Sequence, residues 1–420
     1  MNRRLYAVWL AMLVLLPPLV IAGLIFWRSA TSEAASSSVH LDLTIQQDRD
    51  VQPINWPIRP LAAVPPQPTP MEPFRMDFRH TDASALDLSQ LGETLAGSAT
   101  FDSRTIWPAS LPSDFVPSRL LEEGKDPGLG VRALHRQGIT GGGVRVAYVG
   151  MPLWRGHPEY KHAIARYTEV GTLFFTPWFA EVSVLAGQSS GVAPGVAIDY
   201  YGVQFQKDAS SQARTFVYMA AAIDMILSEN RTLPPAKRVR VICAPIGANP
   251  DEEGYEALHK AYQQARREGV LIVTADMDSL YSYQIFGLGR RPYADPNSVA
   301  AFTAGSFWSD FWSKNGGKLE QSGSDIILVP MDARTVAMQT GPYFGYFPQV
   351  GLGVALPWGA GLYALAAQVK PTVTPEEFLR AAHDTGDYIT VSRNDRQYQL
   401  GPIVNPTKLI SSLKKGSNTP

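Results

Sequence analysis

The chain has 420 residues, of which 45% are hydrophobic, and its 37 Lys and Arg residues nearly balance its 38 Asp and Glu residues. A chain of this length can bury one large core or two ordinary ones, so small size places no limit on the fold. The net charge of −1 leaves no excess of positive charge of the kind that nucleic-acid-binding proteins carry, and we expect no nucleic-acid role.

The first segment of the chain is a candidate membrane span. Residues 5–27 carry no formal charge, follow Arg3 and Arg4, precede Arg28, and can cross a bilayer at about 1.5 Å per residue. The flanking arginines and the aromatic residues near both ends favour a membrane helix over a buried core helix. A cleaved signal peptide is the alternative, although its apolar region is usually shorter, about 7–15 residues. We predict a cytoplasmic stub and transmembrane anchor at residues 1–28, with the N-terminus in the cytoplasm and the rest of this single-pass chain outside.

The segments that follow differ in composition. Residues 29–75 are rich in Ser, Gln and Pro, which favours an extended stalk. Residues 76–124 regain apolar side chains without a helical or alternating pattern, so we expect an N-terminal extension that packs on the main domain. We assign residues 125–392 to that main domain and residues 393–420 to a C-terminal tail.

From Gly138 onward, short β-rich runs alternate with helical segments, which is typical of a mainly parallel sheet covered by helices on both faces. Residues 351–369 are almost wholly apolar or Gly, and their glycines and Pro357 favour a central buried helix over a second membrane span. The sequence therefore predicts a three-layer α/β fold. The expected strands are 144–149, 197–203, 239–246, 270–275, 299–304 and 326–329, and the expected helices are about 211–229, 251–268 and 375–384.

Short motifs occur in a fixed order between residues 125 and 390. They are Gly138-Ile-Thr-Gly-Gly-Gly-Val-Arg-Val-Ala-Tyr-Val149 with Gly156-His-Pro-Glu159, then Gly191-Val-Ala-Pro194, Pro245-Ile-Gly247, Gly269-Val-Leu-Ile-Val273, and Ala355-Leu-Pro-Trp-Gly-Ala-Gly361 with Thr374-Pro-Glu-Glu377. In this order and at this spacing the chain resembles the subtilase family (subtilisin-like, S8) of serine peptidases. The resemblance implies a subtilisin-like fold and a peptidase ancestry.

A subtilase requires an Asp that orients a His, the His as general base, an Asn that completes the oxyanion hole, and a Ser nucleophile at a helix N-terminus. The positions that match these four residues are Gly150, Pro177, Asp278 and Gly353, and none of them carries the required side chain. Shifting the alignment does not restore the chemistry, because the sequence has no Asp at residues 127–198, no His at 163–258 and no Ser at 325–391. We therefore expect no catalytic residue and no cofactor.

Other candidate site residues have simpler structural interpretations. Asp276 and Asp278 follow a predicted strand and could hold a cation with backbone oxygens, but a solvated or helix-capping role is favoured. His157 is expected to serve the structure. The single cysteine, Cys243, lies in an apolar run that predicts a buried strand, and a Cys243–His259 dyad is a minor alternative.

The leading interpretation is a membrane-anchored, extracytoplasmic pseudoprotease that binds a peptide or protein without cleaving it. The alternatives are a functional S8 endopeptidase with displaced catalytic residues and a structural envelope protein. A cysteine-poor exported protein with this anchor fits a bacterium. Aromatic side chains near the former cleft could supply the binding: Phe174, Phe175, Trp178, Phe179, Tyr200, Tyr201, Tyr343, Phe344, Tyr346 and Phe347.

Overall fold

The computed structural model describes residues 44–69, 72, 74–171, 179–207, 213–319, 324–393 and 395–416. The predicted anchor at residues 5–27, the first part of the predicted stalk, Pro177, and the aromatic residues Phe174, Phe175 and Trp178 lie outside the described residues.

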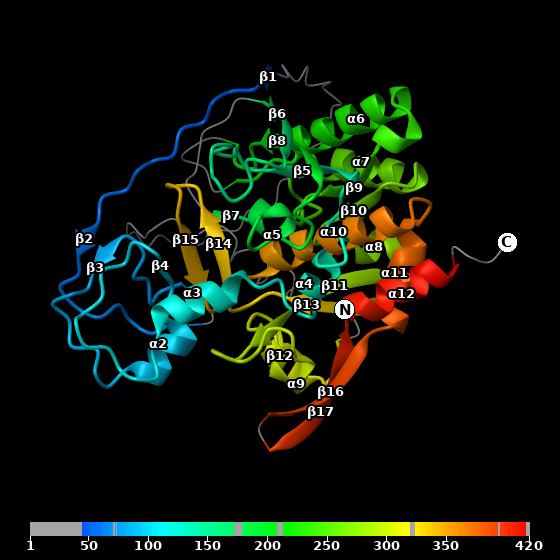
Figure 1. Ribbon diagram of the computed structural model, residues 1–420. Coiled ribbons are helices and arrows are strands. Elements are labelled where there is room, and N and C mark those ends of the chain that lie inside the picture. Colours follow the sequence, from blue (N-terminus) through cyan, green and yellow to red (C-terminus); the bar gives the residue numbers. More distant parts are fainter. Residues whose placement is uncertain are drawn as a thin grey trace, which may run out of the picture.

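A six-stranded sheet forms the centre of the main domain, in the order β1-β6-β8-β5-β9-β10 (Figure 1). All neighbouring strands from β6 to β10 run parallel, and β1 pairs antiparallel with β6 at one edge. The sheet is therefore mainly parallel, as the alternating pattern predicted. The strands are β1 (Ile45–Gln47), β5 (Arg145–Gly150), β6 (Ile164–Val170), β8 (Ala197–Val203), β9 (Val239–Cys243) and β10 (Leu271–Val273).

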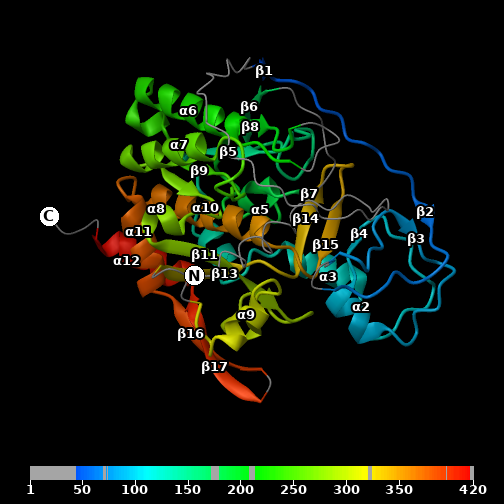
Figure 2. The same cartoon turned by 180° about the vertical axis from the view of Figure 1, so that it is seen from behind.

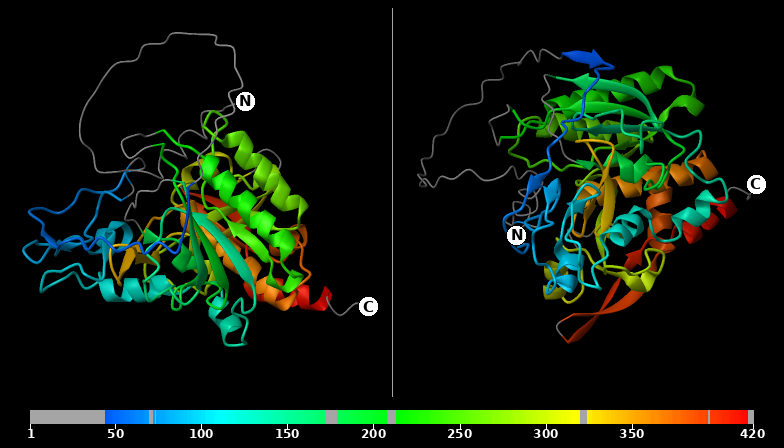
Figure 3. Two further views of the ribbon diagram at one scale, coloured as in Figure 1. Left: turned by 90° about the horizontal axis from the view of Figure 1, so that it is seen from above. Right: turned by 60° about the vertical axis from the view of Figure 1, so that its left-hand side comes forward.

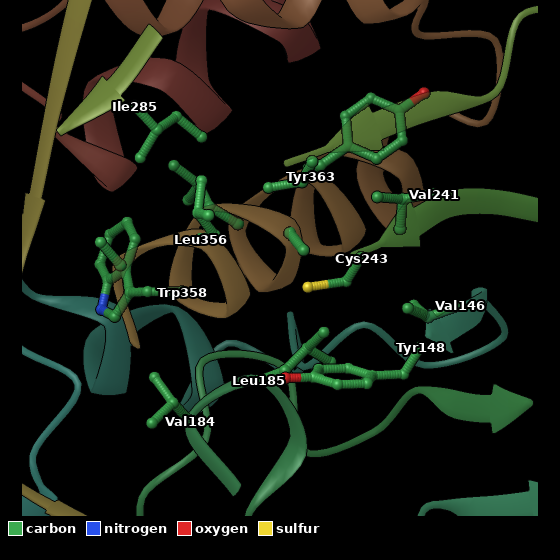
Figure 4. Close-up of a cluster of buried hydrophobic side chains, with 14 of the residues drawn as sticks. Val146, Tyr148, Val184, Leu185, Val241, Cys243, Ile285, Leu356, Trp358 and Tyr363 are labelled. Atoms are coloured by element: carbon green, nitrogen blue, oxygen red, sulfur yellow. The ribbon is translucent and has the colours of Figure 1, made fainter. Parts of the chain in front are cut away.

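Helices cover both faces of this sheet, which explains why the residues of β8 and β10 are almost all buried. Helices α5 (Val182–Ala186) and α10 (Leu352–Val369) lie on one face, whereas α6 (Val217–Thr232) and α7 (Tyr255–Arg267) lie on the other (Figures 1 and 3). Figure 4 shows Val146 and Tyr148 of β5 and Val241 and Cys243 of β9 directed toward α10 and α5. The three layers predicted from the sequence are present.

Helix α10 is the central helix of the domain. In the described part of the chain it is the one helix long and apolar enough to cross a membrane, but 83% of it is buried. It contacts β9 and β10 of the first sheet and also reaches a second, five-stranded sheet of order β12-β11-β13-β17-β16. The prediction of a buried core helix is confirmed for these residues. The strands of the second sheet are β11 (Tyr283–Arg290), β12 (Phe302–Ala304), β13 (Asp325–Pro330), β16 (Asp387–Arg393) and β17 (Arg396–Ile403).

Strand β6 was not expected, because polar side chains interrupt its apolar pattern. Arg166 on β6 donates two hydrogen bonds of 2.8 and 2.6 Å to Glu229 on α6. Arg145 on β5 donates at 2.6 and 3.0 Å to Asp199 on β8. These ion pairs allow charged side chains to lie partly buried at the end of the sheet. Strand β6 therefore lacks the run of apolar residues from which a buried strand is predicted.

The C-terminal segment corrects one prediction. Residues 393–420 were assigned to a tail, yet β17 pairs in parallel with β13 and antiparallel with β16, and the β16–β17 hairpin projects from the domain (Figure 2). Helix α12 (Pro406–Gly416) follows and contacts α10 and α11 (Pro375–Asp384). Its side chains Leu409, Ile410 and Leu413 are buried. The described part of this segment belongs to the core because its apolar residues recur at helical spacing.

The N-terminal extension has a small core of its own that includes Phe78, Leu95, Phe101 and Phe115 and is closed by Tyr346 of the main domain. Its strand β4 joins a four-stranded sheet of order β4-β15-β14-β7, so it packs on the main domain as expected. The elements of the stalk and the extension are β2 (Arg59–Pro60), β3 (Thr81–Asp82), α2 (Gly92–Ser98), β4 (Phe101–Asp102) and α3 (Pro117–Lys125). The remaining elements belong to the main domain and are α4 (Val131–His135), β7 (Phe179–Ala180), β14 (Arg334–Met338) and β15 (Phe344–Phe347).

The described part of the predicted stalk also differs from a free linker. Strand β1 pairs with β6, β2 pairs with β3, and Val51 is buried (Figure 3). The proline-rich composition gives an extended chain, as expected, but that chain lies along the domain from residue 44 onward.

Candidate functional site

Three elements that are far apart in the sequence meet at one point, where a subtilase would hold its catalytic residues. Tyr148 near the end of β5 places its hydroxyl 3.4 Å from Oε2 of Glu181, the residue that begins α5. A Cβ atom on Gly353, at the start of α10, would lie 2.6 Å from Oε1 of the same carboxyl group. The structure thus brings Gly353 and the Tyr148 side chain to one carboxyl group, that of Glu181, and Gly150 follows Tyr148 at the end of β5.

Aromatic rings fill the space beside Gly150. The rings of Tyr148 and Tyr200 stack with centroids 5.2 Å apart and an angle of 9° between their planes. A Cβ atom on Gly150 would lie 2.9 Å from the Tyr148 ring and 3.0 Å from the Tyr200 hydroxyl. That hydroxyl donates a 2.6 Å hydrogen bond to the backbone oxygen of Met151. A carboxylate at this position would displace both rings.

Glu181 is the site residue that sequence reasoning missed. Burial raises the pKa of its carboxyl group to about 8, although the side chain retains some solvent contact. At neutral pH the group is mostly protonated, so only a minor fraction is in the ionised form that could accept a proton. A glutamate is not among the four residue types that a subtilase requires, so the sequence motifs did not point to it. A single acid within the apolar segment 178–186 was the signal that could have identified it.

Asp276 and Asp278 do not form a metal site with their surroundings. Asp276 accepts a 3.1 Å hydrogen bond from the backbone N–H of Ala248, and burial raises its pKa to about 7. Asp278 is the first residue of the short helix α8 (Asp278–Tyr281), whose N-cap is Met277, so its carboxylate lies in the first turn, where the helix dipole favours negative charge. Throughout the described ranges there is no group of three or more His, Cys, Asp or Glu that could hold a metal ion.

His157 has a structural role, because both of its ring nitrogens take part in hydrogen bonds within the fold. Its Nε2 lies 3.2 Å from the backbone oxygen of Tyr343, and its Nδ1 accepts a 3.1 Å bond from the Glu159 backbone N–H, so Nε2 carries the proton. The buried Glu159 carboxylate in turn accepts bonds from Ser189 and Ser190. Both ring nitrogens are therefore occupied, and no proton acceptor is left for catalysis.

Cys243 and His259 lie on opposite faces of the sheet. Cys243 is fully buried toward α10, and burial raises the pKa of its thiol well above the usual value (Figure 4). His259 belongs to α7, and its Nε2 lies 3.9 Å from Asp276 Oδ2. The structure does not bring the thiol and the imidazole together, and the thiol is unreactive.

The aromatic side chains near the former cleft belong to the core wherever they are described. Phe179, Tyr200, Tyr201, Tyr343, Tyr346 and Phe347 are each 8% exposed or less, and Phe344 is half-buried. They pack the interior, so they cannot form the exposed peptide-binding surface that the sequence suggested.

The subtilase-like motifs occupy the positions expected of them. The glycine turn precedes β5, and it requires Gly141, which has φ +83° and would place a Cβ 2.6 Å from Val196. The Gly191-Val-Ala-Pro motif precedes β8, Gly269 precedes β10, and the last motif lies within α10. The chain has an α/β fold with a parallel-rich sheet whose order of elements is consistent with a subtilisin-like fold.

Comparison with known proteins gives matches to solved structures at low sequence identity. No protein-family model matches the chain, and no curated protein matches it. Among solved structures it is similar to the prenylagaramide maturation protease PagA, with 18% identity and a TM-score of 0.44 over 68% of this chain and 98% of that one. It is also similar to the patellamide maturation protease PatA, with 17% identity and a TM-score of 0.42 over 65% of this chain and 98% of that one. A protease from Pseudoalteromonas arctica has 14% identity and a TM-score of 0.47 over 70% of this chain and 97% of that one.

Proposed function

We propose that this chain is a membrane-anchored, extracytoplasmic pseudoprotease that binds a peptide or protein and does not cleave it. The observation that carries the proposal is the junction of β5, α5 and α10. The start of α10 offers Gly353 in place of a nucleophile, and the nearest acid–base group is Glu181, a carboxyl that is mostly protonated at neutral pH.

Loss of the catalytic side chains from a serine protease lowers its rate of hydrolysis by many orders of magnitude. Removing one oxyanion-hole donor from a serine protease typically lowers turnover by about 10²- to 10³-fold, and without a triad only about 10³- to 10⁴-fold catalysis over water remains. The oxyanion position in this chain carries Asp278, whose carboxylate would repel a developing negative charge. Gly353 supplies no nucleophile at the junction, and the position matched to the oxyanion-hole asparagine supplies no side-chain amide.

Labelling of the purified full chain with a fluorophosphonate probe tests the loss of chemistry. We expect no labelling of the natural protein beside a labelled active subtilisin. The Gly353→Ser variant should also stay unlabelled, because no histidine accompanies the new hydroxyl and the Glu181 carboxyl is mostly protonated at neutral pH. Labelling of the natural protein at a mapped serine would instead favour a peptidase with displaced catalytic residues.

Equilibrium dialysis against a mixed peptide library tests the binding. We expect the full chain to retain a subset of peptides, and mass spectrometry should recover them uncleaved. If no peptide were retained above the level of a detergent-only control, the structural envelope protein would be the better description.

A further inference from the structure

Two neighbouring pockets lie beside α3 and α4. The larger, of about 310 Å³, is lined by Arg132, His135, Arg136, Gln188 and Ser189 among others, and no acidic side chain lines it. The smaller, of about 240 Å³, is acidic, and its lining includes Glu122, Glu123, Asp126 and Asp295. Arg132 lines both pockets and separates the basic one from the acidic one.

The basic pocket has one arginine held in place and one without a counter-ion. Arg132 donates a 3.2 Å bond to the backbone oxygen of Ser189, and its Nε lies 3.5 Å from Asp126. Arg136 is exposed, and no carboxylate in the described part of the chain forms an ion pair with it. The pocket therefore presents a positioned guanidinium and a second guanidinium free to close on a ligand.

His135 lines the pocket, but it carries no charge at neutral pH and offers no free N–H to an anion. Its Nε2 lies 2.8 Å from the backbone oxygen of Val192, so this nitrogen carries the proton. Burial lowers the pKa of the ring further, and the nearby Arg132 acts in the same direction. The two arginines are thus the cations of the pocket at pH 7.

A buried arginine behind the pocket adds to its positive potential. Arg334 is only 3% exposed, and its guanidinium donates to the backbone oxygens of Asp126 and Ser190, which adjoin the pocket wall. Its Nε is buried without a hydrogen-bond partner. Burial and the neighbouring Arg290 lower the pKa of Arg334 to about 9. Arg290 likewise donates to the backbone oxygens of Ala294 and Ala333.

Arg334 and Arg290 are hydrogen-bonded to carbonyl oxygens, and the Asp126 carboxylate acts on the pKa of both in the direction opposite to burial. Burying a guanidinium costs free energy that dipoles and one shared carboxylate offset only in part. An anion in the adjacent pocket would offset part of this cost, since charges interact more strongly across the low-dielectric interior than across water. A volume of about 310 Å³ is at the lower end of the range for ligand pockets, which favours a small charged group over a large apolar ligand.

We propose that the pocket formed by Arg132, His135, Arg136, Gln188 and Ser189 binds an oxyanion, either a phosphate monoester or a carboxylate. The site is separate from the junction at Gly353 and goes beyond the proposed loss of peptidase activity. Arg136 provides the mobile contact, Arg132 provides the fixed contact, and Arg334 supplies positive potential from behind.

Equilibrium dialysis of radiolabelled inorganic phosphate against the purified full chain at constant ionic strength tests this site. We expect one saturable site per chain. Arg136→Gln should weaken binding about ten-fold or more, as the loss of one charge-assisted hydrogen bond does. The matched control is Arg380→Gln, which removes an equally exposed arginine from α11 and should bind phosphate as the natural protein does.

Competition then separates the two sources of an oxyanion. Displacement of the label by methyl phosphate in preference to acetate would support a phosphate ester, and the reverse order would support a carboxylate. The proposal is overturned if phosphate shows no saturable binding, if chloride at equal ionic strength displaces it equally well, or if Arg136→Gln binds like Arg380→Gln. Because Arg136 is remote from Gly353, these results are independent of the fluorophosphonate result.

Discussion

Glu181 combines an acidic side chain with surroundings that oppose its ionisation. It lies between the stacked Tyr148 ring and Gly353, and the Tyr148 hydroxyl is its only hydrogen-bonding partner among the described contacts, at 3.4 Å. Desolvation therefore dominates, and its pKa rises from 4.5 to about 8. The same desolvation that keeps the Glu181 carboxyl protonated at neutral pH makes the stability of the native state depend on pH.

This sensitivity has a defined direction. An unfolded Glu181 ionises near pH 4.5, whereas the native carboxyl keeps its proton to about 8, so the native state binds more protons in this interval. Its contribution to stability is thus lost as the pH rises from about 4.5 to 8. We expect Glu181→Gln to match the natural protein at pH 5 and to exceed it at pH 9 by on the order of 1–3 kcal/mol, after allowance for partial exposure.

Urea unfolding of the full chain in detergent at pH 5, 7 and 9 measures this difference. Glu256→Gln is the control, because Glu256 is an exposed glutamate on α7 and should leave the pH dependence unchanged. A Glu181→Gln protein with the same pH dependence as the natural one would mean that the native Glu181 is ionised.

At the scale of elements, α10 is apolar on every side because it is enclosed by two sheets. Small residues allow the close approach: a Cβ on Gly359 would lie 2.6 Å from Ile285 of β11, and one on Gly361 would lie 2.8 Å from Val192. The Trp358 indole N–H donates a 2.8 Å bond to the backbone oxygen of Pro127, so its polar atom is satisfied (Figure 4). Helix α10 is hydrophobic because protein surrounds it on all sides, and contact with lipid is not needed to explain its composition.

The C-terminal helix α12 is part of that enclosure, so we expect truncation of its buried face to destabilise the domain. Leu409→Ala removes a fully buried side chain and should lower the free energy of unfolding by about 2–5 kcal/mol. Ser411→Ala on the exposed face of the same helix should change it by less than about 0.5 kcal/mol. Chemical denaturation of both variants provides the measurement, and equal effects would mean that α12 is detached in solution.

At the scale of the whole molecule, the domain begins with β1 at one edge of the sheet, and its last described helix packs on α10. The predicted anchor at residues 5–27 is separated from β1 by seventeen residues, a chain length of at most about 56 Å at roughly 3.3 Å per residue.

Cysteine labelling in spheroplasts tests this topology. The natural chain has one cysteine, Cys243, which is fully buried, so it gives little background. A membrane-impermeant maleimide should label Ser411→Cys on the exposed face of α12 in intact spheroplasts, because we propose that the domain lies outside the membrane. Labelling that appears only after the membrane is permeabilised would place the domain in the cytoplasm and reverse the predicted orientation.

Several elements could be predicted from the sequence because neighbouring residues determine them. The strand predicted at 197–203 coincides with β8, and the helix predicted at 375–384 coincides with α11. Helix α11 has its start signal in the sequence: the Thr374 side chain accepts a 3.1 Å bond from the Glu377 N–H, and Pro375 fits the first turn. The apolar run at 351–369 likewise indicated a buried helix.

Only the tertiary structure decided which of these elements meet. It placed Glu181 against Gly353, put Arg334 behind Asp126 and Ser190, and added β17 to the sheet beside β13. The local pattern of apolar residues predicts whether a residue is buried, but it does not predict which residue it contacts. Contacts between residues far apart in the sequence do not change the spacing of apolar residues in either segment. The proposed loss of catalytic side chains therefore rests on the sequence, whereas the raised pKa of Glu181 and the basic pocket were determined by packing.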